Sequence, residues 1–144
     1  MEARGQVKPY LLETQSGKVL PNIGVLKASA LQTNGAFEIL EYAGPASPPP
    51  HIHRQREEAF YVLEGSFRFV LSQEMIEAGP GAFIFIPRGT RHGFTISPGA
   101  RALLFIAPAG LEGFFQELGE GLQAGRPNDE IRAALAGKYD SEPV

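Results

Sequence analysis

The chain has 144 residues, a formal net charge of −3, and neither a cysteine nor a run of lysines and arginines. These properties exclude disulfides and thiolate metal sites, and they are untypical of nucleic-acid-binding proteins. A chain of this length is expected to form a single domain with a sizeable core. Its twelve prolines and seventeen glycines favour many short strands joined by turns over a helical bundle.

Apolar segments are short throughout the sequence. The longest uncharged apolar run, ALLFIAPAG at residues 102–110, is far shorter than the roughly 20 residues that a transmembrane helix requires. The beginning of the chain, MEARGQVKPY, lacks the apolar stretch of a secretory signal. We therefore expect a cytoplasmic protein that binds neither a membrane nor a nucleic acid.

Residues 1–24 are expected to form an extended arm that pairs with an edge strand or with a neighbouring subunit. Between residues 25 and 108 the sequence predicts short strands separated by glycines and prolines, with a candidate tight turn at Gly65-Ser66. The strands are GAFEILEY (35–42), AFYVLEG (59–65), SFRFVLS (66–72), AFIFIP (82–87), RHGFTIS (91–97) and ARALLFIAP (100–108). This spacing predicts an antiparallel β-sandwich or barrel. Its apolar edge strands and the arm predict a homodimer, because such surfaces are normally covered.

After Pro108 the sequence changes to helical periodicity, and helices are expected only in this segment, at about residues 111–138. In LEGFFQELGEGL (111–122) apolar residues recur at three- and four-residue intervals, as on one face of a helix. NDEIRAALAGKY predicts a second short helix, with Asn128 or Asp129 as N-cap and Gly137 near its end. We expect both helices to cover an end or edge of the sheet.

All three histidines of the chain stand beside turns. His51 and His53 follow three prolines and would point to the same face of a strand, where two imidazoles can share a metal ion. Glu58 would face the opposite way on an unbroken strand and could join them only if the intervening residues bend. Glu57 fits a straight strand, so the spacing alone leaves the carboxylate undecided. His92 follows a second turn, PRGTR.

Two longer motifs contain these residues. GPASPPPHIHRQREEAFYVLEG fits G-x(5)-H-x-H-x(4)-E-x(6)-G with one additional residue before the first histidine, and GAFIFIPRGTRH fits G-x(5)-P-x-G-x(2)-H. With both motifs in this order, the chain resembles the cupin superfamily over about residues 35–108. The resemblance implies a jelly-roll β-barrel. The family's second motif usually continues to an asparagine, and this chain has Ile96 there instead.

The resemblance also implies one divalent transition metal ion, such as iron, manganese, nickel, cobalt or zinc, in a mixed nitrogen and oxygen site. It selects Glu58 over Glu57 as the carboxylate. No second acid–base pair stands at a defined spacing, so Glu58 is also the predicted proton acceptor, ahead of Glu57 and Tyr61. The implied ligands are His51, His53, Glu58 and His92.

A finer resemblance extends over most of the chain. EEAFYVLEGSFRF, AGPGAFIFIPRGTRHGF, APAGLEGFFQELG and LAGKYD resemble small single-domain bacterial cupins described as quercetin 2,3-dioxygenase-like. This implies a metal-dependent dioxygenase that acts on a small phenolic or enolisable substrate. A metal-dependent isomerase or hydrolase and a non-catalytic, ligand-binding cupin are the alternatives, since all three share the metal site. Two or three of the strand aromatics are expected to line an apolar pocket: Phe60, Tyr61, Phe67, Phe69, Phe83, Phe85 and Phe94.

Overall fold

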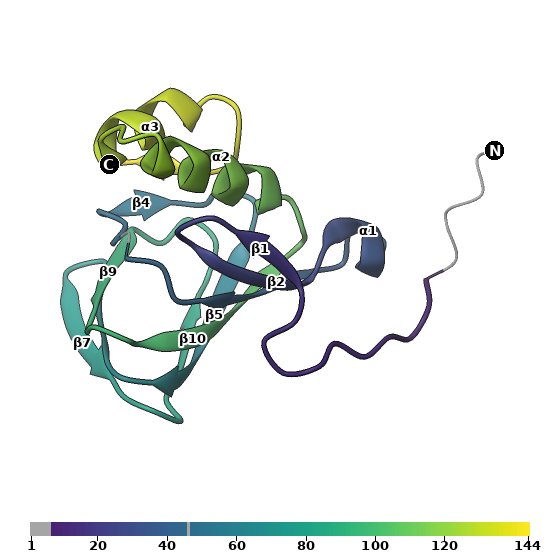
Figure 1. The fold of residues 1–144 in the computed structure, drawn as a ribbon. Coiled ribbons are helices and arrows are strands. Elements are labelled where there is room, and N and C mark those ends of the chain that lie inside the picture. The colour runs from purple at the N-terminus through teal and green to yellow at the C-terminus, as the bar shows by residue number, and fades with distance from the viewer. Residues whose placement is uncertain (1–6, 46) are drawn as a thin grey trace.

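Two antiparallel β-sheets form the body of the protein (Figure 1). The computed structural model describes residues 7–45 and 47–144. The strands of the first sheet are ordered β1-β2-β3-β10-β5-β8, and those of the second β11-β4-β9-β6-β7. This is the predicted jelly roll. The strands are β1 (Lys18–Leu20), β2 (Gly24–Ala28), β3 (Glu38–Tyr42), β4 (His51–Ile52), β5 (Glu57–Glu64), β6 (Phe67–Leu71), β7 (Glu74–Ala78), β8 (Phe83–Ile86), β9 (His92–Ile96), β10 (Arg101–Ala107) and β11 (Glu142–Pro143).

The segment before β2 joins the edge of the first sheet. β1 pairs antiparallel with β2, with Val19 opposite Val25. After β2 comes a single helical turn, α1 (Ala30–Thr33). The prediction that helices occur only in the C-terminal segment is therefore wrong. Ser29 and Gln32 form a capping box at its start, and this reciprocal pair of hydrogen bonds stabilises a turn too short to show a hydrophobic period.

The core lies between the two sheets, where alternate side chains of each strand meet. On β5, Phe60 is buried while Tyr61 points outward, as the two-residue period of a strand requires. The Phe60 ring contacts rings from the second sheet, with centroid distances of 5.1 Å to Phe69 and 5.2 Å to Phe94. Phe67 completes this aromatic centre.

Two connections in the barrel were not specified by the sequence. The predicted tight turn at Gly65-Ser66 connects β5 in the first sheet with β6 in the second, so the two strands do not pair with each other. Gly65 has a φ of 69°, and a Cβ there would lie 2.7 Å from the Cβ of Ala100, so only glycine fits. The edge strand β7 was not predicted, because four of its five residues are exposed and its sequence therefore does not alternate.

Helices α2 (Glu112–Gln123) and α3 (Asn128–Leu135) lie together over one end of the barrel, as expected (Figure 1). Phe114, Phe115 and Leu118 form the buried face of α2. The predicted N-cap of α3 is wrong, because Pro127 takes that position and the Asn128 side chain is instead bonded to Arg132 further along the helix. Among the described residues, no helix has the length and apolar character needed to cross a bilayer.

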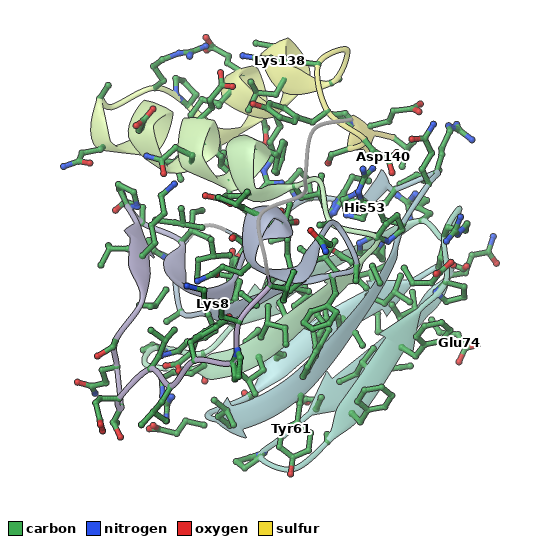
Figure 2. The ribbon with its side chains drawn as sticks, turned by 90° about the vertical axis from the view of Figure 1, so that its right-hand side faces the viewer. Lys8, His53, Tyr61, Glu74, Lys138 and Asp140 are labelled. Carbon is green, nitrogen blue, oxygen red and sulfur yellow. The ribbon has the colours of Figure 1, made fainter. Side chains whose placement is uncertain are left out.

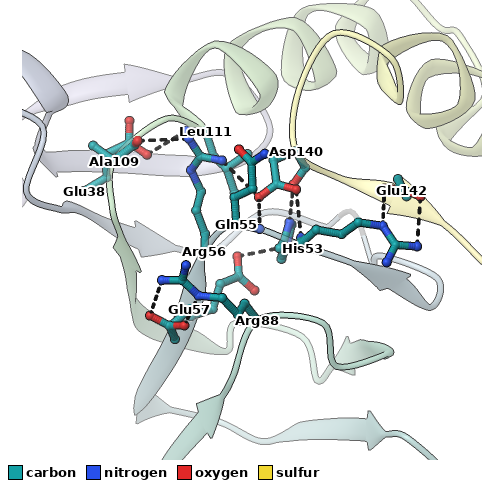
Figure 3. Close-up of polar contacts among 12 residues, drawn as sticks. Glu38, His53, Gln55, Arg56, Glu57, Arg88, Ala109, Leu111, Asp140 and Glu142 are labelled. Carbon is teal, nitrogen blue, oxygen red and sulfur yellow. Dashed lines mark hydrogen bonds and ion pairs between the residues drawn. The ribbon is translucent and has the colours of Figure 1, made fainter.

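Glu38 on β3 fixes the start of α2. The residue is only 2% exposed, and its two carboxylate oxygens accept the backbone N–H groups of Leu111 at 2.8 Å and Glu112 at 3.2 Å (Figure 3). The helix has no cap from its own N-cap side chain. A carboxylate at this end satisfies donors that the helix leaves open and complements its dipole. The contact therefore holds α2 against the barrel.

Candidate metal centre

The four residues that the cupin motifs select come from three strands and the segment between two of them. His51 on β4 lies directly opposite His92 on β9 in the second sheet. Glu58 on β5 approaches from the first sheet, where it pairs with Ile86 and Ile106. His53 lies just after β4, close to Asp140 near the end of the chain (Figure 2). All four predicted ligands are buried: His51, His53, Glu58 and His92.

The side chains of these residues converge on one point. The four potential ligand atoms all lie within 4.8 Å of one another. Glu58 Oε1 is 3.1 Å from His92 Nε2, and Glu58 Oε2 is 3.3 Å from His53 Nε2. The His51 and His92 ring centroids are 4.3 Å apart. This cluster of three imidazoles and one carboxylate could hold a metal ion.

Backbone carbonyl groups orient all three imidazole rings. Each ring has its Nδ1 atom within hydrogen-bond distance of a carbonyl oxygen, which can only accept, so Nδ1 carries the proton. In the neutral ring, Nε2 then presents its lone pair to the centre of the cluster, as in metal-binding histidines. The contacts are His51 to Pro49 at 2.8 Å, His53 to Asp140 at 2.6 Å and His92 to Thr90 at 2.8 Å.

The surroundings of His53 Nε2 indicate whether a cation fits the cluster. The atom is buried and has no hydrogen-bond partner among the described residues, since Glu58 at 3.3 Å does not meet the geometry of a hydrogen bond. A buried polar atom without a partner costs about 1–3 kcal/mol. A divalent cation would satisfy this lone pair, and three nitrogens with one carboxylate suit a first-row transition metal. The donors therefore fit the implied ion.

A bend between β4 and β5 turns Glu58 into the barrel. The Asp140 carboxylate accepts the backbone N–H groups of Arg54 and Gln55, each at 2.8 Å, and binds the Arg56 guanidinium at 3.0 Å (Figure 3). These contacts interrupt the extended chain between the two strands. The side-chain alternation restarts after the bend, and Glu58 is only 4% exposed.

Glu57 points the other way. Its carboxylate binds the Arg88 guanidinium through two contacts on the outer side of the strand (Figure 3). The half-exposed pair lies outside the histidine cluster. The structure thus places the Glu58 side chain inside the cluster and the Glu57 side chain outside it.

The charges in the cluster favour metal binding. Burial, followed by the neighbouring His92 and His53 rings, lowers the pKa of His51 to about 3, so this ring stays neutral. Burial also acts to lower the pKa of His53, but the Glu58 carboxylate outweighs it and the net shift is upward. For Glu58, burial acts to raise the pKa, but the close contacts with His53 and His92 outweigh it and bring the pKa well below its usual range. Glu58 is therefore ionised.

A small cavity adjoins the cluster. The volume open to the centre of a water molecule is about 20 Å³, which is room for a single water. Phe60 and Phe94 line it, which matches the expectation that few strand aromatics reach the pocket. The α2 and α3 helices close it from the opposite side. The remaining lining residues are Tyr42, Pro48, His51, His53, Glu58, Leu104, Phe114, Phe115 and Arg132.

The sequence had not indicated some of these residues as part of the site. Asp140 lies 87 residues after His53, and the only sign of it was the LAGKYD segment in the family resemblance. Arg132 is a charged residue in an amphipathic helix, a pattern that normally predicts a solvated side chain. By contrast, Tyr61, Phe83 and Phe85 point out of the barrel and do not line the cavity, because they occupy the outward positions of β5 and β8.

Residues 38–107 match the protein family described as Cupin domain. The match runs from β3 to β10 and includes all four residues of the cluster. These residues form a cupin domain. The cupin also resembles a protein from Klebsiella pneumoniae with a double-stranded beta-helix domain, at a TM-score of 0.52 and 15% identity, covering 62% of this chain and 78% of that one. That likeness concerns the fold alone.

Two further similarities concern proteins with named activities. The cupin is 29% identical to the quercetin 2,3-dioxygenase of Bacillus subtilis (strain 168), over 78% of this chain. It spans about a third of the length of that relative, 35%. It is 33% identical to the polyketide cyclase RemF from Streptomyces resistomycificus, with a TM-score of 0.49 and coverage of 75% of this chain and 78% of that one.

Proposed function

We propose that the cluster binds one divalent transition metal ion through the three histidine Nε2 atoms and the Glu58 carboxylate. Support comes from the carbonyl contacts that turn each Nε2 toward the centre of the cluster, from the buried His53 Nε2 without a hydrogen bond, and from the ionised carboxylate. Iron, manganese, nickel, cobalt and zinc all suit this donor set. The bound ion would supply Lewis acidity and, if redox-active, a path for electrons from an ionised substrate to dioxygen.

We further propose that this cupin is a dioxygenase of the quercetinase type, acting on a small phenolic or enolisable compound. The observation that carries the proposal is the buried cluster of three histidines and one glutamate in a cavity lined by aromatic rings. The similarity to a quercetin 2,3-dioxygenase supports the same reaction class. Phe60 and Phe94 would exclude bulk water from the reacting groups.

Glu58 is the proposed proton acceptor for the substrate hydroxyl. It is the carboxylate that faces the cavity, whereas Glu57 is held outside by Arg88. A carboxylate with a depressed pKa is a weak base, so proton transfer to Glu58 requires a substrate hydroxyl that binding makes more acidic.

The proposed activity predicts oxygen consumption with flavonols. Protein purified without oxygen is loaded with one metal at a time, its metal content is measured by elemental analysis, and oxygen uptake is followed with quercetin. We expect close to one ion per chain and one dioxygen consumed per quercetin, since a dioxygenase needs no external reductant. Glu58→Gln should lose most of this uptake, whereas Glu142→Gln, a change to a half-exposed glutamate outside the cluster, should keep it.

Two other results would favour the alternative functions. Conversion of an enolisable substrate without oxygen uptake would point to an isomerase or hydrolase that uses the ion as a Lewis acid. Stabilisation by a ligand that is never converted would point to a binding protein. Either result would contradict the dioxygenase while leaving the metal site intact.

We also propose that the protein forms a homodimer through the outer face of the first sheet. Tyr61, Phe83 and Phe85 are 42%, 63% and 55% exposed. Tyr61 lies opposite Phe83 on one side and Leu103 on the other. The half-buried Phe105 extends this apolar face across β10. Contiguous exposed apolar surface of this kind normally marks an interface.

The surroundings of the apolar face are those of an interface between two copies. β8 is the edge strand of its sheet, so its outer hydrogen-bonding groups pair with no strand formed by residues 7–45 and 47–144. Charged pairs border the face, with Glu57–Arg88 at one end and Arg101 with Glu41 and Glu64 at the other. An apolar centre with a charged rim suits a twofold interface in which each copy presents the same surface.

Replacement of Phe85 by glutamate tests this interface. Light scattering at micromolar concentration should show a dimer for the wild-type protein and a monomer for Phe85→Glu. Met75→Glu serves as the control, since Met75 is 65% exposed on β7 of the other sheet, and this variant should remain a dimer. A monomeric wild-type protein at this concentration would contradict the proposal.

A further inference from the structure

Arg132 is a buried cation in the wall of the metal cavity. It lies on α3 with 6% of its surface exposed, and it lines the same cavity as His51, His53 and Glu58. It is the cationic side chain, histidines apart, among the residues that line this cavity. The position is unusual because arginine is rarely buried without a partner of opposite charge.

The described part of the chain provides Arg132 with no carboxylate partner within 4.0 Å. Its Nε donates to Asn128 Oδ1 at 2.8 Å, and its guanidinium carbon lies 5.8 Å from the centre of the Phe114 ring. Asp129, three residues before it on the same helix, is exposed. Both contacts orient the guanidinium, but neither neutralises its charge.

Arg56 provides a comparison within the same protein. Its side chain is 15% exposed and forms an ion pair with Asp140 at 3.0 Å. A buried charge that lacks such a pair is costly, and replacement by an apolar side chain of similar volume is often neutral or stabilising. An unpaired buried arginine that faces a cavity is therefore better explained by an anionic ligand than by packing.

The charge of the loaded site leads to the same conclusion. With neutral imidazoles, a divalent ion contributes two positive charges, Arg132 one positive charge and Glu58 one negative charge, which leaves the buried site at about +2. Such a site favours a ligand that carries negative charge.

We infer that Arg132 binds an anionic oxygen of the substrate, so that the substrates are small molecules with an ionised phenol, enol or carboxylate beside the oxygen that faces the metal. The inference rests on the proposed metal site. The guanidinium donates to this oxygen through charge-assisted hydrogen bonds, and Glu58 takes the proton that the hydroxyl loses. Because the cavity has room for one water, a ring enters only after the α2–α3 cover moves.

A chelating phenol tests this role by its colour. The probe is 4-nitrocatechol, whose visible absorption moves to longer wavelength when its hydroxyl groups ionise. Wild-type protein and Arg132→Met are loaded with the same metal, their metal content is confirmed by elemental analysis, and the probe is titrated into each. We expect Arg132→Met to weaken probe binding about 10- to 100-fold, the loss typical of a hydrogen bond to a charged group. The bound probe should also ionise at a higher pH in the variant.

Three controls separate this role from a structural one. Arg126→Met removes an equally charged but exposed arginine beside α3 and should bind the probe as the wild type does. Arg132→Lys keeps the charge and should recover part of the affinity. The dimethyl ether of the probe cannot ionise, and its affinity should not differ between wild type and Arg132→Met. If Arg132→Met does not fold, Arg132→Gln replaces it in the same comparison.

The outcomes distinguish the inference from the proposed metal site. Wild-type protein that contains no metal after loading would overturn the proposed function itself. Metal-loaded wild type and Arg132→Met that bind the probe equally, with the same ionisation pH, would overturn the role of Arg132 alone. Metal-loaded wild-type protein that leaves the probe spectrum unchanged would also overturn it.

Discussion

Addition of a divalent transition metal ion to the metal-free protein is expected to raise its melting temperature by about 8–16 °C. An ion that binds only the folded state stabilises it by RT ln(1 + [L]/Kd), which is about 4 kcal/mol at a thousandfold excess over Kd. For a domain of this size, each kcal/mol corresponds to about 2–4 °C. A chelator should reverse the gain. Thermal unfolding with and without metal, followed by circular dichroism, measures the effect.

The two adjacent glutamates provide a matched pair of variants for this measurement. Glu58→Ala removes the buried carboxylate of the proposed metal site and should lose most of the metal-dependent gain. Glu57→Ala removes only the ion pair with Arg88 outside the cluster and should keep nearly all of it. His51→Ala, His53→Ala and His92→Ala should each lose most of the gain. If Glu57→Ala lost the ion and Glu58→Ala retained it, the orientation of β5 would be wrong by one residue.

Acidification should displace the ion by protonating the histidines in a defined order, with His53 before His51. In the metal-free protein the pKa of His53 is raised, since the Glu58 carboxylate outweighs the effect of burial. Protons therefore compete for His53 at a higher pH than for a free imidazole, and the gain should begin to fall already above pH 6.5. His51, with a pKa lowered to about 3, remains unprotonated across this range. Loss of the gain only well below pH 6 would contradict this order.

The residues of the cluster could be predicted because they form a local pattern. His51, His53 and Glu58 stand within eight positions, and His92 follows the second motif, so spacing and family resemblance together identified all four. The choice of Glu58 required a bend before it, but the contact that holds this bend could not be predicted from these positions. It depends on Asp140, which lies 86 positions after Arg54 in the sequence. Long-range contacts between polar side chains leave no period in a sequence.

The strands and helices likewise differ in whether a local sequence pattern or a distant contact determines them. Strands with one buried face, such as β6 with Phe67 and Phe69, were visible from their alternation. The edge strand β7 was not, because backbone pairing with β6 holds it in place while its side chains remain exposed. The N-terminal end of α2 is likewise fixed by Glu38, a distant side chain. Helix boundaries set by tertiary contacts cannot be obtained from capping residues in the local sequence.

Replacement of Asp140 by alanine is expected to lower the free energy of unfolding by about 3–5 kcal/mol, as does breaking a buried ion pair. The Asp140 side chain is 11% exposed, and its loss would leave the largely buried Arg56 without its anion and two backbone N–H groups without their acceptor. At about 2–4 °C per kcal/mol, the melting temperature should fall by roughly 6–20 °C. Denaturant unfolding of the metal-free protein measures the free energy directly.

The same variant should bind metal more weakly, because the bend that Asp140 holds determines where Glu58 points. Glu142→Ala is the control, since Glu142 binds Arg54 in an exposed pair nearby, and this variant should change neither property.

The contribution of Asp140 should also depend on pH. Burial acts to raise the pKa of Asp140, but the N–H groups of Arg54 and Gln55 outweigh it, so the net shift is downward. The stabilisation by Asp140 is therefore complete above the pKa of about 3.9 in the unfolded chain, and it is lost as the pH falls through the lower pKa of the folded state. In acid, the free energies of unfolding of the wild type and Asp140→Ala should converge. An Asp140→Ala variant with wild-type stability and metal affinity would show that the bend is encoded within residues 53–56 themselves.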